Sequence, residues 1–386
     1  MALNTLTALS PNLFAALNIV SRELTGMIPA VALNSNGAQQ VAVGDTVTIP
    51  IVGAATVDDV TPAMTTPTPT GQTPTTVSLA ITKSRRAEFG FVGEEQLSLN
   101  NGAGFGDIQT QMIAQAMRSL VNEIEADLVS NYIYTSRAYG TVGTVPFTSG
   151  LGELAEMHRI LVENGAPTTD KQMVLNTIAG AKLRSNTGLT NVNQAGTTDT
   201  LREGIFGRLT GFAVREGGQF GTHTAGTASG ATTTAAGFAV GTTNIPTAAA
   251  GTGTILAGDV ITFAGDTNKY VVVTGVADVS GASTALTIAA PGLKKAIPAA
   301  ATAITVTADY SMNMAFDRNA IVLLTRAPAL VNGSDSATDR MIITDPVSGL
   351  AFEVSVYEGY RMTRYEVAIA WGYKVIKPEH TALLVG

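Results

Sequence analysis

Apolar side chains recur at every fourth position over one long stretch of the chain, which predicts an amphipathic helix. The members of this stripe are Ile108, Met112, Ala116, Leu120, Ile124, Leu128 and Tyr132. Asp107 stands directly before the stripe and can serve as the N-cap. At ~1.5 Å per residue the helix would be roughly 40 Å long, longer than a compact domain usually needs. It is therefore either an exposed strut that packs against a neighbour or a long buried helix of an ordinary enzyme.

Two segments before this helix alternate apolar and polar residues and predict strands over 46–52 and 76–82. The segment between them is rich in threonine and proline, and its prolines forbid helix and disfavour a central strand. Together they predict an extended hairpin, with the basic pair Arg85 and Arg86 just after its base. Because a lone hairpin is marginally stable in water, we expect this one to lie on another subunit.

The two ends of the chain carry further patterns. Ser10 and Pro11 begin an amphipathic helix whose apolar residues include Phe14 and Leu17. This terminal helix either packs internally or reaches a neighbour as an arm. Near the C-terminus, the alternation over 350–357 and 361–378 predicts antiparallel strands with one covered face.

The composition of the chain changes near residue 218. From 219 to 309 alanine, threonine and glycine dominate, and charged residues are few. Strand patterns separated by glycine or proline turns lie at 258–263, 269–273, 285–288 and 303–306. These patterns predict a small all-β domain, a barrel or a sandwich, inserted into a loop of the host domain. Its first part, 221–254, is either partly disordered or an irregular packed arm.

The composition of the chain narrows the range of functions that it can have. Charged residues make up 14% of the 386 residues and hydrophobic residues 45%, whereas about 25% of residues are charged in typical domains. Such a composition suits a chain that hides most of its surface against copies of itself. The net charge of -7 argues against sequence-independent nucleic-acid binding. The chain has no cysteine for disulfides or thiol chemistry, and we expect neither a signal peptide nor a membrane span.

The sequence offers little support for catalysis. The three histidines, His158, His223 and His380, are far apart in sequence, and none stands in a zinc-binding pattern. The glycine-rich segment before the long helix fits a hinge better than an anion site. Glu94 and Glu95 could form a catalytic dyad, but intersubunit ion pairs are the better interpretation. We therefore expect no enzymatic activity, no catalytic or metal-binding residue and no cofactor.

The order of these elements resembles that of the major capsid proteins of tailed bacteriophages, which have the HK97-like fold. That order is an N-terminal arm, an extended loop, a long spine helix, an apical domain and a return to the peripheral domain. The local resemblance is best at Met173–Asn176, at Gly204–Gly207 followed by Phe212–Val214, and at Arg364–Tyr373. The β insertion makes the chain similar to the P22 coat-protein branch, in which an inserted barrel decorates the apical domain.

The resemblance implies an α+β, HK97-like capsid fold with an inserted small all-β domain. The expected parts are an N-terminal arm (1–40), an extended loop (41–100), the spine helix with peripheral domain (101–145), a first apical part (146–217), the insert (218–310), a second apical part (311–340) and the peripheral C-terminal strands (341–386). It also implies contacts between subunits. Our candidates for these contacts are Arg85, Arg86, Glu94, Glu95, Phe14 and Leu17.

The function implied by the resemblance is that of a major capsid protein. Such a chain self-assembles, as pentamers and hexamers, into the icosahedral head shell that encloses double-stranded DNA without sequence-specific binding. The expected partners are a scaffolding protein, a portal and a cement protein, and the expected location is the virion, after assembly in the host bacterial cytoplasm. Two alternatives stay open: an encapsulin-type nanocompartment shell protein, and a non-shell β-rich virion or surface protein.

Covalent joining of subunits is not expected. Some relatives of this fold join their subunits by a Lys–Asn isopeptide bond that uses a lysine on the extended loop. Here the hairpin tip from Val57 to Thr75 contains no lysine, and Lys83 near the base is the nearest. The shell must then be held by apolar burial, β-pairing and charge contacts.

Overall fold

The structure is a computed structural model. It describes residues 24–386 except 52–56, 58, 61, 63–73, 101–104, 192–203, 205, 284, 331–334 and 347. Phe14 and Leu17 therefore lie outside the described residues. Among those described, no helix is both long and apolar enough to cross a membrane.

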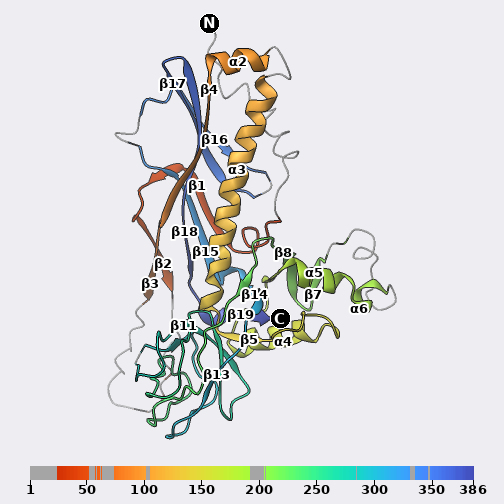
Figure 1. The fold of residues 1–386 in the computed structure, drawn as a ribbon, viewed down its shortest axis with the longest axis vertical. Coiled ribbons are helices and arrows are strands. Elements are labelled where there is room, and N and C mark those ends of the chain that lie inside the picture. Colours follow the sequence, from red (N-terminus) through yellow and green to blue (C-terminus); the bar gives the residue numbers. More distant parts are fainter. Residues whose placement is uncertain are drawn as a thin grey trace.

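One sheet forms the elongated part of the molecule (Figure 1). In the described chain its strands run in the order β1 (Ala32–Val41), β15 (Ile321–Pro328), β18 (Met362–Val375), β17 (Ala351–Gly359) and β16 (Asp339–Thr344), with β4 (Lys83–Val92) paired to β18. The predicted C-terminal strands are thus present as the antiparallel pair β17 and β18. The expectation of a single covered face was wrong, since consecutive residues in the middle of both strands are buried. β4 pairs with β18 along its whole length, so this part of the predicted extended loop (41–100) belongs to the sheet.

The long helix is α3 (Phe105–Val129), which crosses this sheet (Figure 1). Its buried apolar residues are Ile113, Ala114, Ala116, Met117, Leu120, Val121, Ile124, Leu128 and Val129. The strict four-residue stripe was wrong at its N-terminal end, since Met112 is exposed. Four residues turn a helix by about 400°, so such a stripe drifts about 40° per step, whereas the buried face mixes steps of three and four. The helix begins at Phe105, so Asp107 lies inside it and not before its first residue as predicted.

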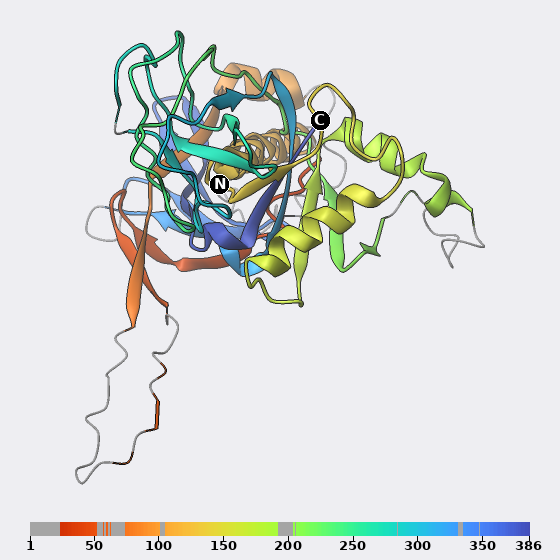
Figure 2. The same cartoon turned by 90° about the horizontal axis from the view of Figure 1, so that it is seen from below.

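A second sheet unites the apical region and the insert. In the described residues its order is β13 (Ile304–Val306), β10 (Val260–Phe263), β11 (Lys269–Thr274), β5 (Arg137–Tyr139), β19 (Thr381–Val385), β14 (Tyr310–Asp317), β6 (Lys171–Leu175), β8 (Phe212–Glu216) and β7 (Arg208–Leu209). Two short strands, β12 (Thr287–Ile288) and β9 (Thr222–His223), pair with β11 and β14. Helix α4 (Gly152–Glu163) covers the apical part, and the short helices α5 (Thr177–Arg184) and α6 (Thr187–Thr190) extend from it (Figures 1 and 2).

The expected hairpin is present as β2 (Thr46–Ile51) paired antiparallel with β3 (Thr75–Ala80). It projects from the body of the molecule (Figure 2). At its base Leu79 and Ile81 are buried against Val322 and Leu324 of the sheet. Most of its predicted tip lies outside the described residues.

The insert has an apolar core of its own, formed by strands and turns between residues 231 and 304. Residues 221–254 belong to this core, since Ala231 and Ile245 are buried and Ser229 bridges to Thr252. The suggestion of partial disorder for this segment was wrong, because irregular backbone pairs through isolated bridges that no periodic pattern reveals. The insert also continues the host sheet, since β11 pairs with β5.

Candidate assembly interface

A cluster of charged side chains ties the spine helix to the sheet. Lys83 Nζ lies 2.8 Å from Asp127 Oδ1 and 3.4 Å from Glu123 Oε1. The hydrogen bond to Asp127 raises the pKa of Lys83. The buried Trp371 donates from Nε1 to Asp127 Oδ2 at 2.9 Å. These contacts connect α3 to β4 and β18 of the sheet.

Arg85 and Arg86 do not form a single site, because neighbouring residues of a strand point to opposite faces. Arg85 lies on the helix side of β4, with Nε 3.2 Å from Glu123 Oε1. Arg86 lies on the other face, with Nη1 3.2 Å from Glu366 Oε2. Both arginines have a carboxylate partner in their own chain, yet both side chains are more than half exposed. Their pairing across a subunit boundary stays a prediction.

Glu94 and Glu95 stand in the first turn of α2 (Gly93–Asn100), where acidic residues favour the positive end of the helix dipole. Glu95 Oε2 accepts the backbone N–H of Val92 at 3.0 Å. The strand between Arg86 and Val92 spans about 20 Å. These glutamates and the arginines therefore lie at different ends of β4.

The same end of the molecule carries an apolar patch, which we call the end patch. Its exposed residues are Val92, Leu97, Tyr360 and Met362. Val92 faces Met362 across the β4–β18 pair, and Tyr360, in the β17–β18 turn, is 90% exposed. Arg361 in this turn has φ of 57°, an unfavourable backbone for a residue other than glycine. Apolar side chains held outward in this way are typical of contact surfaces.

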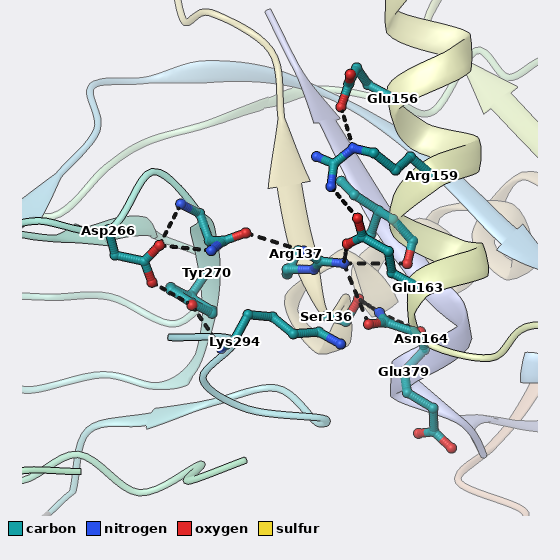
Figure 3. Close-up of polar contacts among 12 residues, drawn as sticks. Ser136, Arg137, Glu156, Arg159, Glu163, Asn164, Asp266, Tyr270, Lys294 and Glu379 are labelled. Atoms are coloured by element: carbon teal, nitrogen blue, oxygen red, sulfur yellow. Dashed lines mark hydrogen bonds and ion pairs between the residues drawn. The ribbon is translucent and has the colours of Figure 1, made fainter. Parts of the chain in front are cut away.

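A polar joint connects the insert to α4 (Figure 3). The buried Arg137 donates from Nη2 to Glu163 Oε2 at 2.7 Å and from Nη1 to Asn268 Oδ1 at 3.2 Å. Arg137 and Arg159 hold the pKa of Glu163 below its usual range. A cavity of about 570 Å³ lies beside this joint, lined largely by polar and charged side chains. Its cationic groups already have partners, since Arg159 binds Glu156 and Glu163 and Lys269 donates to the carbonyl of Gly140.

The three histidines lie in separate places. The half-buried His158 has Nε2 3.2 Å from Nζ of the buried Lys171. His223 lies between Tyr132 Oη (2.8 Å) and Asp259 Oδ1 (2.9 Å), at the point where the insert joins the host. His380 is buried near the C-terminal strand. Within the described ranges, no three His, Cys, Asp or Glu residues come together to hold a metal ion.

Sequence reasoning missed these ties between distant segments. Glu123 and Asp127 stand four residues apart on the predicted helix, and that spacing was the available signal for a shared acidic face. The partners of Arg137 and His223 carried no such signal, because they are distant in sequence. Glu163 and Asn268 lie 26 and 131 residues from Arg137. Asp259 and Tyr132 lie 36 and 91 residues from His223.

No protein-family model matches the sequence, and no curated protein matches it. Solved phage capsid structures do match in fold. A chain of Mycobacterium phage Che8 is 15% identical, with a TM-score of 0.51 over 95% of this chain and 92% of that chain. A chain from the capsid of cyanophage P-SCSP1u is 12% identical, with a TM-score of 0.50 over 95% and 89%.

The chain has the HK97-like capsid fold. The expected α+β class is confirmed, with the long α3 as the spine helix and β2–β3 as the extended loop of this fold. Identity of 15% or less establishes the fold and not the function.

Proposed function

We propose that this chain is the major capsid protein of a tailed bacteriophage, which self-assembles into the icosahedral shell around the phage genome. The observation that supports this most is the HK97-like capsid fold over 95% of the chain. Fold alone does not define function. Three features of the chain itself add support: a projecting hairpin, an exposed end patch and a low content of charge.

The hairpin supports a role in contacts between copies. Val47, Ile49 and Val77 are only partly buried in their own subunit, although they share the apolar face of the ribbon. A two-stranded ribbon is marginally stable in water, so this face gains most by covering a neighbour. Repeated around symmetry axes, such contacts close rings of five and six subunits into a shell.

The interface candidates are Arg85, Arg86, Glu94, Glu95, Phe14 and Leu17. For the arginines the test is the pair of changes Arg85→Gln and Arg86→Gln, because glutamate would be repelled by their own carboxylates. One-sided loss of a buried interfacial charge pair costs about 2–5 kcal/mol, so particle yield should collapse while subunit unfolding changes little. The matched control is Arg159→Gln. Arg159 is likewise exposed and likewise paired with carboxylates of its own chain, Glu156 and Glu163. Equal particle yields from both variants would remove the arginines from the interface.

The proposal assigns the chain a structural and non-enzymatic role. Its partners would be copies of itself, a scaffolding protein, a portal and a cement protein, and it would enclose double-stranded DNA without sequence-specific binding. It would be located in the virion after assembly in the cytoplasm of the host bacterium. The domain limits near residues 218 and 310 belong to this proposal, with the insert on the outer face of the shell.

The proposal is tested by expressing the chain alone and with the neighbouring structural genes. Closed particles tens of nanometres across are expected in at least one of these conditions. Soluble monomers or open fibres under all of them would contradict it. Native particles that enclose an enzyme instead of DNA would favour the nanocompartment alternative.

A further inference from the structure

The spine helix carries a buried carboxylate, Glu125, that takes no part in its contacts with β4 and β18. Glu125 is fully buried. It lies two residues from Glu123 and from Asp127, so it points about 200° away from the side that is tied to β4. Its Oε1 accepts the backbone N–H groups of Gly26 at 2.5 Å and Met27 at 2.6 Å, and its Oε2 accepts that of Ile28 at 3.0 Å.

We call residues 24–31 the arm root, because residues 1–23 precede it. Most of the arm root is packed, with Met27, Ile28, Ala30 and Val31 buried, while Leu24 at its start is exposed. Gly218 donates its N–H to the carbonyl of Leu24 at 2.7 Å, and Arg318 donates to the carbonyls of Pro29 and Val31 at 3.3 and 3.4 Å.

Gly26 shows how closely the arm root approaches its surroundings. A side chain there would place Cβ 2.6 Å from the Glu216 carbonyl oxygen and 2.6 Å from Val174 Cγ1. Real contacts of a Cβ are essentially never that short. Glycine is therefore required for the arm root to lie between the spine helix and the strand that leads into the insert.

The three N–H groups are the polar partners of Glu125 within the described residues. Burial raises the pKa of Glu125, and the three hydrogen bonds act in the opposite direction. Consecutive backbone N–H groups that converge on one anion form a cradle whose recognition does not depend on the side chains of the bound segment. A carboxylate costs free energy in an apolar core unless it is hydrogen-bonded, so its place on the helix defines where the arm root can bind.

We infer that Glu125 is the positioning residue of the arm root: it fixes on the spine helix the place of the segment that directly follows residues 1–23 in the chain. This inference rests on the proposed function in one respect, namely that the N-terminal segment contacts neighbouring subunits. The carboxylate itself acts within one subunit, so it can be tested before any shell forms.

The test is amide hydrogen exchange of the full-length, unassembled subunit, compared among wild type, Glu125→Ala and Glu125→Gln. Glu125→Ala leaves three N–H groups without an acceptor, and exchange at residues 26–28 should rise at least about tenfold. Glu125→Gln should give an intermediate rise, because its oxygen can still accept two N–H groups while its NH2 group faces the third. Glu123→Ala, on the other side of the same helix, is the matched control and should leave residues 26–28 unchanged.

Unchanged exchange at residues 26–28 in both Glu125 variants would overturn the inference. So would a rise spread evenly over the whole chain, because that would assign Glu125 a general structural role. If Glu125→Ala fails to fold, Glu125→Gln decides the matter by the same criterion.

Particle yield of the same variants separates the inference from the proposed function. Glu125→Ala should lower the yield of closed shells several-fold relative to wild type. If wild type forms no shells, the proposed function fails, while the exchange experiment still decides the role of Glu125. Released arm roots together with normal shells would show that the N-terminal segment does not contact neighbours.

Discussion

Asp127 offers a quantitative test of how the spine helix is held to the sheet. Its carboxylate binds two groups of different kinds, the partly exposed ammonium of Lys83 and the buried indole N–H of Trp371. Asp127→Ala removes both contacts, whereas Asp127→Asn keeps an oxygen that can accept the indole N–H. The pair of variants therefore separates the charge interaction from the buried hydrogen bond.

The expected loss in the free energy of unfolding depends on how exposed each partner of Asp127 is. Trp371 is fully buried, so loss of its acceptor leaves an unsatisfied donor at a cost of about 1–3 kcal/mol. The Lys83 side chain is 32% exposed, so its ion pair contributes about 0.5–1 kcal/mol. Asp127→Ala should therefore destabilise the subunit by about 1.5–4 kcal/mol, and Asp127→Asn by about 0.5–1 kcal/mol. Glu123→Ala, which breaks only partly exposed ion pairs, should cost less than about 1 kcal/mol.

Urea unfolding of the unassembled subunit is the assay. The midpoint should fall most in Asp127→Ala and less in Asp127→Asn and Glu123→Ala, with an unchanged slope of free energy against urea. Equal destabilisation by Asp127→Asn and Asp127→Ala would refute the reasoning, because the charge interaction and not the indole hydrogen bond would then dominate. No loss of stability in Asp127→Ala would show that the helix does not depend on this tie.

Three further predictions concern pH, the end patch and covalent bonds. Burial lowers the pKa of His158 and of His380 in the folded subunit. In the unfolded chain the pKa of histidine is about 6.5. The contribution of these two histidines to the free energy of unfolding is therefore complete above about pH 6.5 and is lost as the pH falls through their folded-state pKa values. Melting temperatures should therefore fall between about pH 7.5 and about pH 5.5, less so in His158→Gln, and a flat profile would refute this. Tyr360→Ser with Met362→Ser should change subunit stability by no more than about 0.5 kcal/mol yet reduce shell yield, and a normal yield would remove the end patch from the interface. Mature particles boiled in detergent should run as one band near 39.7 kDa, whereas a ladder would reveal covalent links.

Local periodicity explains which parts of the fold were predictable. The alternation along β2 and β3 predicted strands whose two faces differ in exposure. The alternation along β17 and β18 also predicted strands, although both faces of their central parts are buried. The long helix was predicted for the same kind of reason. The insert was predicted from a change in composition, but its pairing with β5 was not, because strand neighbours far apart in the sequence leave no periodic signal.

The candidate site was harder to predict. Arg85 and Arg86 were treated as a pair, although the alternation of a strand already assigns them to opposite faces. Glu125 lies beside Ile124 in the apolar part of the helix, and a charged residue there signals a buried partner. The partner itself is the backbone around Gly26, which no side-chain pattern could indicate.

The most direct test of the central claim is cryo-electron microscopy of particles purified after expression with the neighbouring structural genes. We predict closed icosahedral shells in which the β2–β3 hairpin of each subunit lies on a neighbour and the insert faces outward. Only monomers or open fibres, or closed shells whose hairpins contact nothing beyond their own subunit, would contradict this account.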